Sequence, residues 1–230
     1  MEVTAEHEAV EQVRAGSERN AVLVAELQHR TRNLLGLVRS MARRILETSP
    51  SADEFHARLD ERLGALSRVQ GLLSRAEAPA VDLRDLIRLE LSAVGVEGEE
   101  RRVQLGGPPI GLPFLTVQTM SLAIHELATN ARKHGALAAP EGSLLVTWTL
   151  EQTDGAAPTL VLDWREKEIP PQEEDVPPRS GYGRELIERA LPYQLGAATQ
   201  LELEDGRLRC RIALPLHHSS EDDHDERNAT

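Results

Sequence analysis

Apolar positions in the first part of the chain recur with the seven-residue spacing of helices that pack against one another. Between residues 10 and 45, the core positions of this repeat become apolar from Val24 onward, and Thr31 is the exception. Such a seam is typical of a coiled coil or a helical bundle. Pro50 predicts the end of this helix, and Ser51 is a suitable N-cap for the next. The apolar seam positions are Val24, Leu27, Leu34, Val38, Met41 and Ile45.

A second helix with the same spacing is predicted to follow, up to about residue 78. Leu59, Leu66 and Leu73 are seven residues apart, and Leu63 lies beside them. Two such helices joined by a short turn form a helical hairpin. A hairpin leaves an apolar stripe uncovered, so we expect it to pair with a second copy or to dock on the rest of the chain. The pattern predicts a helical domain over residues 24–79, after a connector helix over residues 1–23.

Beyond Pro79 the pattern changes to a mixture of strands and helices. Asp82 is a suitable cap for the next helix, and Asp205 with Gly206 predicts a hairpin turn. Pro192 is expected to break or end the last helix. This mixture predicts a two-layer α/β domain with a mixed sheet over residues 80–216. We expect helices near residues 81–95, 113–134 and 181–196, and strands near 101–107, 143–152, 159–166, 199–205 and 207–216.

Composition narrows the classes of protein that remain possible. Apolar residues make up 40% of the 230 residues but aromatic residues only 3%, so aliphatic side chains must build the core. The net charge of −12 argues against broad nucleic-acid binding. A single cysteine, Cys210, excludes a disulfide framework. No apolar run is long enough for membrane insertion and no leader is visible, so we expect a cytoplasmic protein with a disordered acidic tail at residues 217–230.

The short stretch ELQHRTRN, residues 26–33, places several polar residues together on a helix. His29 falls opposite the apolar seam, with Glu26 three residues before it and Asn33 four residues after it on the same face. A lone histidine in such a place is usually an ordinary exposed residue. With a carboxylate close enough to fix its tautomer, a neutral imidazole is also a nucleophile that can attack a phosphorus atom.

The stretch HELATNARKHGAL, residues 125–137, carries a second polar set. Glu126 and Asn130 are four residues apart on one helical face, and Lys133 and His134 follow one turn later. An amide oxygen suits Mg²⁺, and cations suit phosphate oxygens, so this face fits a nucleotide with its metal ion. The alternative is the solvated side of an amphipathic helix. In SGYGREL, glycines precede a helix whose free N–H groups favour phosphate, although this signal is weak by itself.

These stretches, in this order, resemble the HWE-type sensor histidine kinases of bacterial two-component systems. The resemblance rests on ELQHRTRN, HELATNARKHGAL, WRE at residues 164–166 and GYGRELI, and it covers roughly residues 24–215. The three letters of the family name correspond to His125, Trp164 and Glu166.

The resemblance implies an α + α/β fold. A helical-hairpin dimerisation and phosphotransfer domain would precede a GHKL (Bergerat-type) α/β two-layer ATP-binding domain. With ATP and Mg²⁺ as cofactors, His29 would accept the γ-phosphoryl group and Asn130 would hold Mg²⁺. Glu126 would help to orient the reacting groups, while Lys133 and His134 would face phosphates.

The resemblance assigns further roles to the remaining motif residues. Glu166 would lie against the adenine amino group, and Gly181 and Gly183 would border the ATP lid and triphosphate. Many related kinases have an acid directly after the histidine, but this chain has Arg30, so we expect Glu26 to orient the imidazole instead. We expect Asn33, one turn after His29, to orient water for the reverse phosphatase reaction. The phosphoryl group would pass to a response-regulator receiver domain. We expect a homodimer, with a sensor domain missing or supplied elsewhere.

One motif departs from the family pattern. The family usually continues after WRE with E-x-G-G-P, but this chain reads EKEIPP, with Lys167, Glu168 and Ile169. Glycines there let the backbone approach the adenine. The departure keeps open an ATP-independent phosphotransfer or regulatory protein of the same fold that binds a response regulator. A third interpretation, a GHKL ATPase in which Glu126 activates water, leaves the residues around His29 unexplained.

Overall fold

The computed structural model describes residues 21, 24–25, 28, 31–32, 34–75, 80–96, 98–99, 101–152, 157–170 and 182–216. The chain falls into two compact units that divide between Leu59 and Asp60. This division lies inside helix α2 (Ala52–Arg75), so the second half of α2 belongs with the sheet-containing unit. The domain limits expected at residues 23, 79 and 216 stay predictions.

In the first unit, residues 34–48 form a helix whose burial follows the predicted seam. Met41 and Ile45 are buried and Val38 is half-buried, whereas Leu35 and Leu46 on the other faces are exposed. The seven-residue spacing therefore identified the side of this helix whose residues are least exposed. The predicted cap of the next helix is also confirmed for the described residues. The Ser51 hydroxyl accepts the Glu54 N–H at 3.2 Å, directly before α2 begins.

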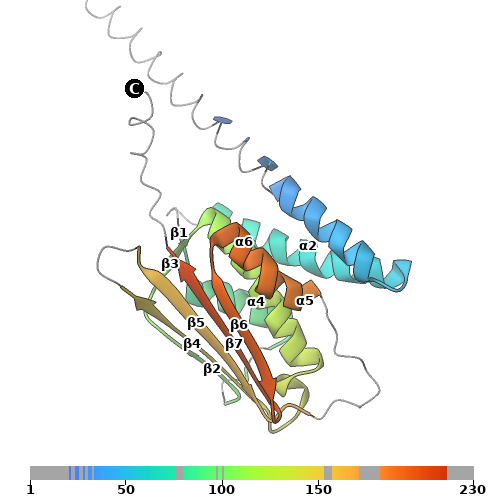
Figure 1. Ribbon diagram of the computed structural model, residues 1–230, viewed down its shortest axis with the longest axis vertical. Helices are drawn as coiled ribbons and strands as arrows, with labels where there is room; N and C mark the ends of the chain where they lie inside the picture. Colours follow the sequence, from blue (N-terminus) through green and yellow to red (C-terminus); the bar gives the residue numbers. More distant parts are fainter. Residues whose placement is uncertain are drawn as a thin grey trace, which may run out of the picture. The chain divides into compact units, whose positions relative to one another are not determined.

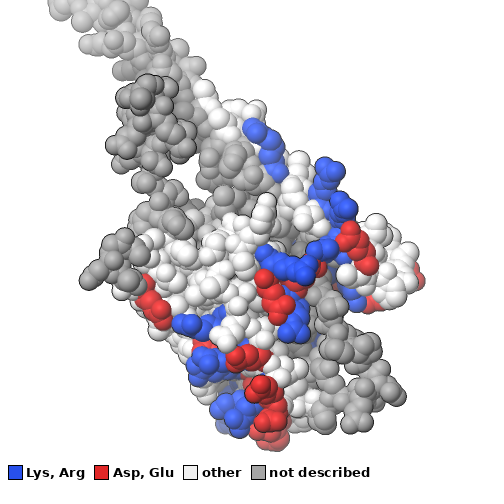
Figure 2. All heavy atoms as spheres, in the orientation of Figure 1, with Lys and Arg blue, Asp and Glu red and all other residues white. Residues whose placement is uncertain are grey.

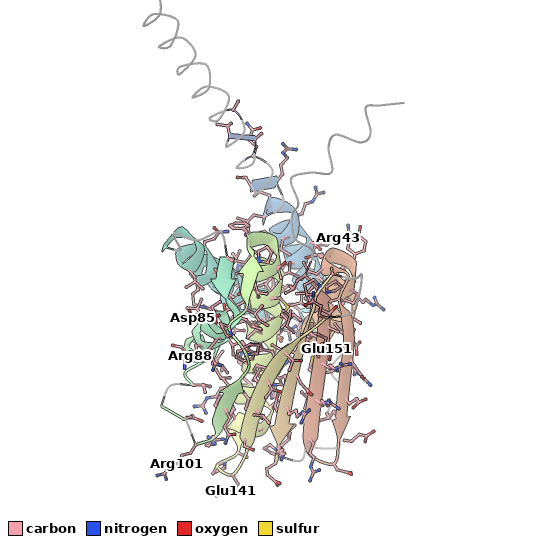
Figure 3. All side chains as sticks on the ribbon, turned by 90° about the vertical axis from the view of Figure 1, so that its left-hand side faces the viewer. Arg43, Asp85, Arg88, Arg101, Glu141 and Glu151 are labelled. Atoms are coloured by element: carbon pink, nitrogen blue, oxygen red, sulfur yellow. The ribbon has the colours of Figure 1, made fainter. Side chains whose placement is uncertain are left out.

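The second unit is built on a five-stranded sheet in the order β2-β4-β5-β7-β6 (Figure 1). The β2–β4 pair is parallel and the other pairs are antiparallel, so the predicted mixed sheet is confirmed. β2 and β4 begin at the same end, where Figure 3 labels Arg101 and Glu141. The strands are β2 (Val103–Gly106), β4 (Ser143–Glu151), β5 (Thr159–Lys167), β6 (Ala198–Glu204) and β7 (Arg207–Pro215).

Helices cover one face of this sheet. Figure 1 shows α4 (Phe114–Lys133) and α6 (Leu191–Leu195) side by side on that face, and α3 (Leu83–Ala93) packs against α4. Because side chains alternate along a strand, one set points to the helices and builds the core. Trp164 on β5 and Cys210 on β7 are opposite each other in this core, and both are fully buried. Burial raises the pKa of the Cys210 thiol to about 12.

The other face of the sheet is charged. Asp163 receives hydrogen bonds from Arg165 at 2.5 Å and from Arg209 at 2.7 Å. Figure 2 shows basic and acidic side chains interleaved towards the end of the sheet that holds the β6–β7 turn, in the lower part of that view. The sheet therefore has one apolar face that packs on helices and one polar face in the described part of the unit.

Several local predictions are confirmed by the backbone. Asp82 caps α3 by accepting the Arg84 N–H at 2.8 Å. Asp205 and Gly206 both have positive φ, 49° and 69°, as a two-residue hairpin turn of type I′ requires. Trp148 is buried, as its place on a strand predicts, and its indole N–H donates to Pro108 at 2.7 Å.

The last helix differs from its prediction. Pro192 does not end it, because the helical run continues to Leu195 and stops at Gly196 with a φ of 64°. The run begins with α5 (Tyr182–Glu185), widens into a π-helix, η2 (Leu186–Ala190), and ends with α6. A wider turn just before a proline accommodates a residue that has no N–H and whose ring crowds the preceding turn.

Three short elements were not predicted. β1 (Ala80–Asp82) pairs with β3 (Gly111–Pro113) in a separate two-stranded sheet, and a 3₁₀ turn, η1 (Ala136–Ala138), follows α4. Three residues are too few for a hydrophobic period to show in the sequence.

Candidate functional site

The predicted nucleotide residues lie at the C-terminal end of α4. Glu126 is buried, whereas Asn130 one turn later is exposed. His134 is the C-cap, and the N–H groups of His134 and Gly135 both donate to the Asn130 carbonyl at 2.8 Å. The helix therefore ends in a tight turn directly after Lys133, and it presents buried and exposed polar groups within two turns of each other.

Gly183 meets the same part of α4 from the start of α5. A Cβ atom on Gly183 would lie 2.8 Å from Glu126 Oε2 and 3.4 Å from Asn130 Nδ2. A side chain at this position would therefore require Glu126 to shift, whereas its distance from Asn130 would be an ordinary contact. The structure brings together three residues that the sequence placed at the nucleotide, Glu126, Asn130 and Gly183. Gly181 lies outside the described residues.

Glu126 forms a buried ion pair with Arg62 of α2. The distance from Arg62 Nη2 to Glu126 Oε1 is 2.6 Å, and the two side chains are only 7% and 11% exposed. Burial raises the pKa of Glu126, and the positive charge of Arg62 opposes this rise. The sequence analysis missed Arg62. A signal was present, because Arg62 is in helical register with the buried Leu66 and Val69 of α2.

Lys133 makes a second contact with α2. Its Nζ lies 2.7 Å from Glu61 Oε1, and both side chains are about half exposed. A pocket of about 250 Å³ beside this pair is lined by Lys133 and His125, but not by Glu126, Asn130 or Glu166. The pocket therefore includes one predicted nucleotide residue, Lys133, but not the cluster of Glu126, Asn130 and Gly183.

Glu166 lies on the helix-covered face of β5, under the turn that follows α4. Its carboxylate accepts the Trp164 indole N–H and the Ala136 backbone N–H, both at 2.9 Å. Burial raises the pKa of Glu166, although both hydrogen bonds oppose the rise. A Cβ on Gly135 would overlap this carboxylate, so Gly135 must be glycine for Glu166 to reach its place. The contact with adenine stays a prediction.

His125 belongs to a different network from Trp164 and Glu166. Its Nδ1 lies 3.1 Å from Glu90 Oε2, which also accepts a hydrogen bond from Arg68 Nη2 at 2.7 Å. Ser121 donates to the other Glu90 oxygen at 2.7 Å. Glu90 is wholly buried, unlike Asp85 and Arg88 of the same helix, which Figure 3 labels at the outside of the fold. The family's three named positions thus serve two separate clusters.

One residue after WRE has a backbone conformation that favours glycine, although the glycines of the family pattern are absent. Glu168 has a φ of 57°, in the left-handed region that favours glycine. The next residue, Ile169, donates its N–H to the Gly206 carbonyl at 2.9 Å and so ties this segment to the β6–β7 turn. The left-handed conformation therefore has an energetic cost at Glu168, because this residue is not glycine.

The other predicted site residues, His29, Glu26 and Asn33, lie outside the described residues. In the part of the chain that the structure describes, no group of three or more His, Cys, Asp or Glu side chains is arranged to hold a metal ion. This result is compatible with an ion held by one amide oxygen and by phosphates. A search of the same residues finds no helix long and apolar enough to cross a membrane.

Comparison with known proteins supports the resemblance. The model of the HWE histidine kinase family matches residues 26–109, a range that includes ELQHRTRN. This chain is thus similar to the HWE histidine kinases over residues 26–109. The predicted resemblance to HWE kinases is confirmed, and His29 lies within the matched segment.

Two relatives extend this HWE similarity along the chain. A blue-light-activated histidine kinase of Rhizobium johnstonii is 30% identical over 213 residues, 91% of this chain and 57% of that protein. Blue-light-activated histidine kinase 1 of Erythrobacter litoralis is 30% identical over 198 residues, 85% of this chain and 53% of that protein. The chain thus spans little more than half the length of these curated relatives.

A solved structure shows that the fold is shared. The Erythrobacter litoralis EL346 blue-light activated histidine kinase aligns with a TM-score of 0.53 and 22% identity, over 84% of this chain and 62% of that one. Its match covers helices and sheet together. The predicted fold class, a helical domain with a GHKL-type α/β domain, is confirmed.

Proposed function

We propose that the chain is an ATP-dependent histidine autokinase of a two-component system. It phosphorylates His29 and passes the phosphoryl group to an aspartate on a response-regulator receiver domain. The observation that carries this proposal is the convergence of Glu126, Asn130 and Gly183 in a chain whose HWE kinase segment contains His29. The names of the relatives as histidine kinases support the same activity.

The cluster on α4 fits a nucleotide with Mg²⁺. The Asn130 side chain is exposed and offers a neutral oxygen, which is a suitable ligand for a metal ion that also binds phosphates. Gly183 has no side chain, so its backbone lies close to Glu126 and Asn130 at the start of α5. When bound, Mg²⁺ would neutralise charge on the transferring phosphoryl group. Lys133, His134, Glu166 and Gly181 complete the proposed nucleotide contacts.

The chemistry at His29 follows from the imidazole. The ring nitrogen without a proton attacks the γ-phosphorus, a P–N bond forms, and the bond to the β–γ bridging oxygen breaks so that ADP leaves with the electron pair. Glu26 orients the ring by accepting the N–H of the other nitrogen. The P–N bond then breaks as the carboxylate of the regulator forms a P–O bond. Asn33 orients water for the reverse phosphatase reaction.

The partners of this reaction follow from the same proposal. A receiver domain takes the phosphoryl group, and the helical hairpin pairs with a second copy to give a homodimer. ATP and a receiver domain place the reaction in the cytoplasm. A sensor supplied beyond these residues or by another protein would set its rate.

The test is incubation of the purified chain with γ-labelled ATP and Mg²⁺. The wild type should acquire label that survives base and is lost in acid, and His29→Ala and Asn130→Ala should acquire none. Arg132→Ala is the matched control, because Arg132 lies on the same end of α4 but contacts Glu99 and the Leu137 carbonyl instead. It should keep its label. Label in His29→Ala, or none in the wild type, would refute the proposal.

A second candidate is an ATP-independent phosphotransfer or regulatory protein that binds a response regulator. The observation in its favour is Glu168, which stands in the left-handed conformation where the family has glycine. Calorimetry with ATP and Mg²⁺ separates the two candidates. The autokinase requires binding that Asn130→Ala weakens, whereas the second candidate requires none.

A further inference from the structure

Two adjacent residues of α2 contact two predicted nucleotide residues of α4. Arg62 pairs with Glu126, and Glu61 pairs with Lys133, all within the second unit. Glu126 and Lys133 are seven residues apart, so they lie two turns apart along the same side of α4. Asn130 lies between them and stays exposed. One stretch of α2 therefore engages both charged residues that flank the proposed metal ligand.

The two contacts differ in their surroundings. The Glu61–Lys133 pair is about half exposed, so water and salt screen it and it fixes little. The Arg62–Glu126 pair is almost dry, and its 2.6 Å distance is that of a strong charge-assisted hydrogen bond. Only the Arg62 contact holds its partner in one defined place.

The two oxygens of Glu126 have different neighbours. Oε1 receives the Arg62 guanidinium, and Oε2 faces Gly183 at the start of α5. Arg62 thus binds the oxygen on the α2 side and leaves the other oxygen at the glycine segment. Rotation of the carboxylate would break the hydrogen bond to Arg62, so the direction of Oε2 is fixed by a residue that the motifs do not include.

We propose that Arg62 is a positioning residue for phosphoryl transfer, which holds the Glu126 carboxylate so that Oε2 points towards Gly183, beside Asn130. This inference rests on the proposed function. Arg62 lies on α2, which follows the ELQHRTRN stretch in the sequence, and it contacts the acid of the nucleotide cluster. A displacement of about 1 Å in a reacting group costs on the order of a hundredfold in rate.

Stability alone does not account for such a pair. A buried ion pair is often no more stabilising than apolar residues of the same volume, because both charges must leave water. α2 already has a second arginine, Arg68, that binds a buried acid, Glu90, in the helical core. Arg68 pairs with no predicted site residue, so Arg62 and Arg68 offer a matched test of positioning against packing.

The test compares Arg62→Met with Arg68→Met in the full chain, by autophosphorylation at several ATP concentrations. For Arg62→Met we expect kcat to fall on the order of tenfold to a hundredfold, with KM for ATP changed by no more than about twofold. Arg68→Met should lose stability but keep kcat near the wild-type value at a temperature where both variants are folded. Arg62→Lys restores a cation without the planar fork, so its kcat should lie between those of the wild type and Arg62→Met.

Each other outcome overturns the inference. A higher kcat in Arg62→Met would mean that the pair is a brake, and equal kcat losses in both methionine variants would mean that it only packs α2. If Arg62→Met does not fold, Arg62→Lys decides, because unchanged kcat there would exclude positioning. A wild-type chain without autophosphorylation refutes the proposed function itself. An active wild type with unaffected Arg62 variants refutes the positioning role alone.

Discussion

Arg62 and Arg68 lie six residues apart on α2, and each binds a buried glutamate of the second unit. Glu90, the partner of Arg68, is enclosed by Ser121 and His125, and both of its oxygens have a side-chain donor. Glu126, the partner of Arg62, has one oxygen on the guanidinium and the other beside Gly183. The same kind of pair therefore occurs in two different settings.

The difference separates a structural charge from one that is available for chemistry. An acid whose oxygens are all bound by side chains in the core can only hold helices together. An acid with one oxygen bound to a cation and the other facing a glycine can also act on a ligand. His125, one of the residues that give the family its name, contacts Glu90 and so belongs to the structural cluster. Its neighbour in sequence, Glu126, is the acid that is available for chemistry.

The largest expected loss of stability concerns the structural pair, Arg68 and Glu90. Arg68→Met should lower the free energy of unfolding by about 3 kcal/mol, because Glu90 would remain buried without its cation. Denaturant unfolding followed by circular dichroism measures this loss. Arg184→Met is the control, because the exposed Arg184–Glu188 pair should contribute at most about 0.5 kcal/mol. Equal losses in the two variants would show that Glu90 does not depend on Arg68.

Gly183→Ala should affect the Arg62–Glu126 pair, whose acid is available for chemistry. The added Cβ would lie 2.8 Å from Glu126 Oε2, so Glu126 must move. We expect a loss of stability of about 2 kcal/mol from overpacking, and a fall in autophosphorylation on the order of tenfold or more. Gly71→Ala in α2 is the control, since nothing lies within 4 Å of its Cβ. Full activity in Gly183→Ala would mean that Glu126 needs no fixed position.

Asp163 extends the comparison to an acid that binds two half-exposed arginines. Burial alone would raise the pKa of Asp163, but the hydrogen bonds from Arg209 and Arg165 outweigh it and lower this pKa to about 2. The unfolded value is near 3.8, so the ionised group stabilises the fold above pH 4 and loses this effect as the pH falls towards 2.

Asp163→Asn should therefore lower the free energy of unfolding at pH 7 by about 1 kcal/mol, after allowance for screening by solvent. The difference between wild type and variant should narrow as the pH falls from 4 towards 2. Unfolding curves measured across that range provide the check. A difference that does not depend on pH would assign the loss to packing rather than to charge.

The smallest expected effect tests backbone strain instead of charge. Glu168→Gly should raise the free energy of unfolding by about 0.5 kcal/mol, because relief of the left-handed conformation slightly exceeds the added freedom of the unfolded chain. Asp205→Gly, at the other non-glycine residue with positive φ, should gain less, because aspartate tolerates this conformation better. A loss of stability in Glu168→Gly would show that the Glu168 side chain makes a favourable contact.

Local signals in the sequence predicted the elements of the fold well. Ser51 and Asp82 mark helix starts through their own side chains, and Asp205 with Gly206 marks a turn through its backbone preference. These signals act between near neighbours, so sequence alone carries them. The π-helix before Pro192 was not predicted, because it depends on how the helix packs on α4 and β6 as well as on the proline.

The sequence predicted those site residues that belong to a recognisable motif and missed the others. Glu126, Asn130 and Gly183 come from two motifs, and the structure brings them together. Their partner Arg62 is 64 positions before Glu126, so no local pattern links the two. A charged residue in register with an apolar stripe was the available signal for both Arg62 and Glu90, but it does not name the partner.

Cys210 gives the protein a built-in reporter of opening. It is the only cysteine of the chain, and its thiol is buried on β7, between β5 and β6, with a pKa of about 12. A thiol-specific reagent should therefore react slowly with the native protein and rapidly once β5 and β7 separate. Alkylation followed by mass spectrometry would time this separation without any engineered probe. A cysteine added elsewhere on the surface would be labelled in preference to Cys210, which suits the attachment of a probe at one chosen position.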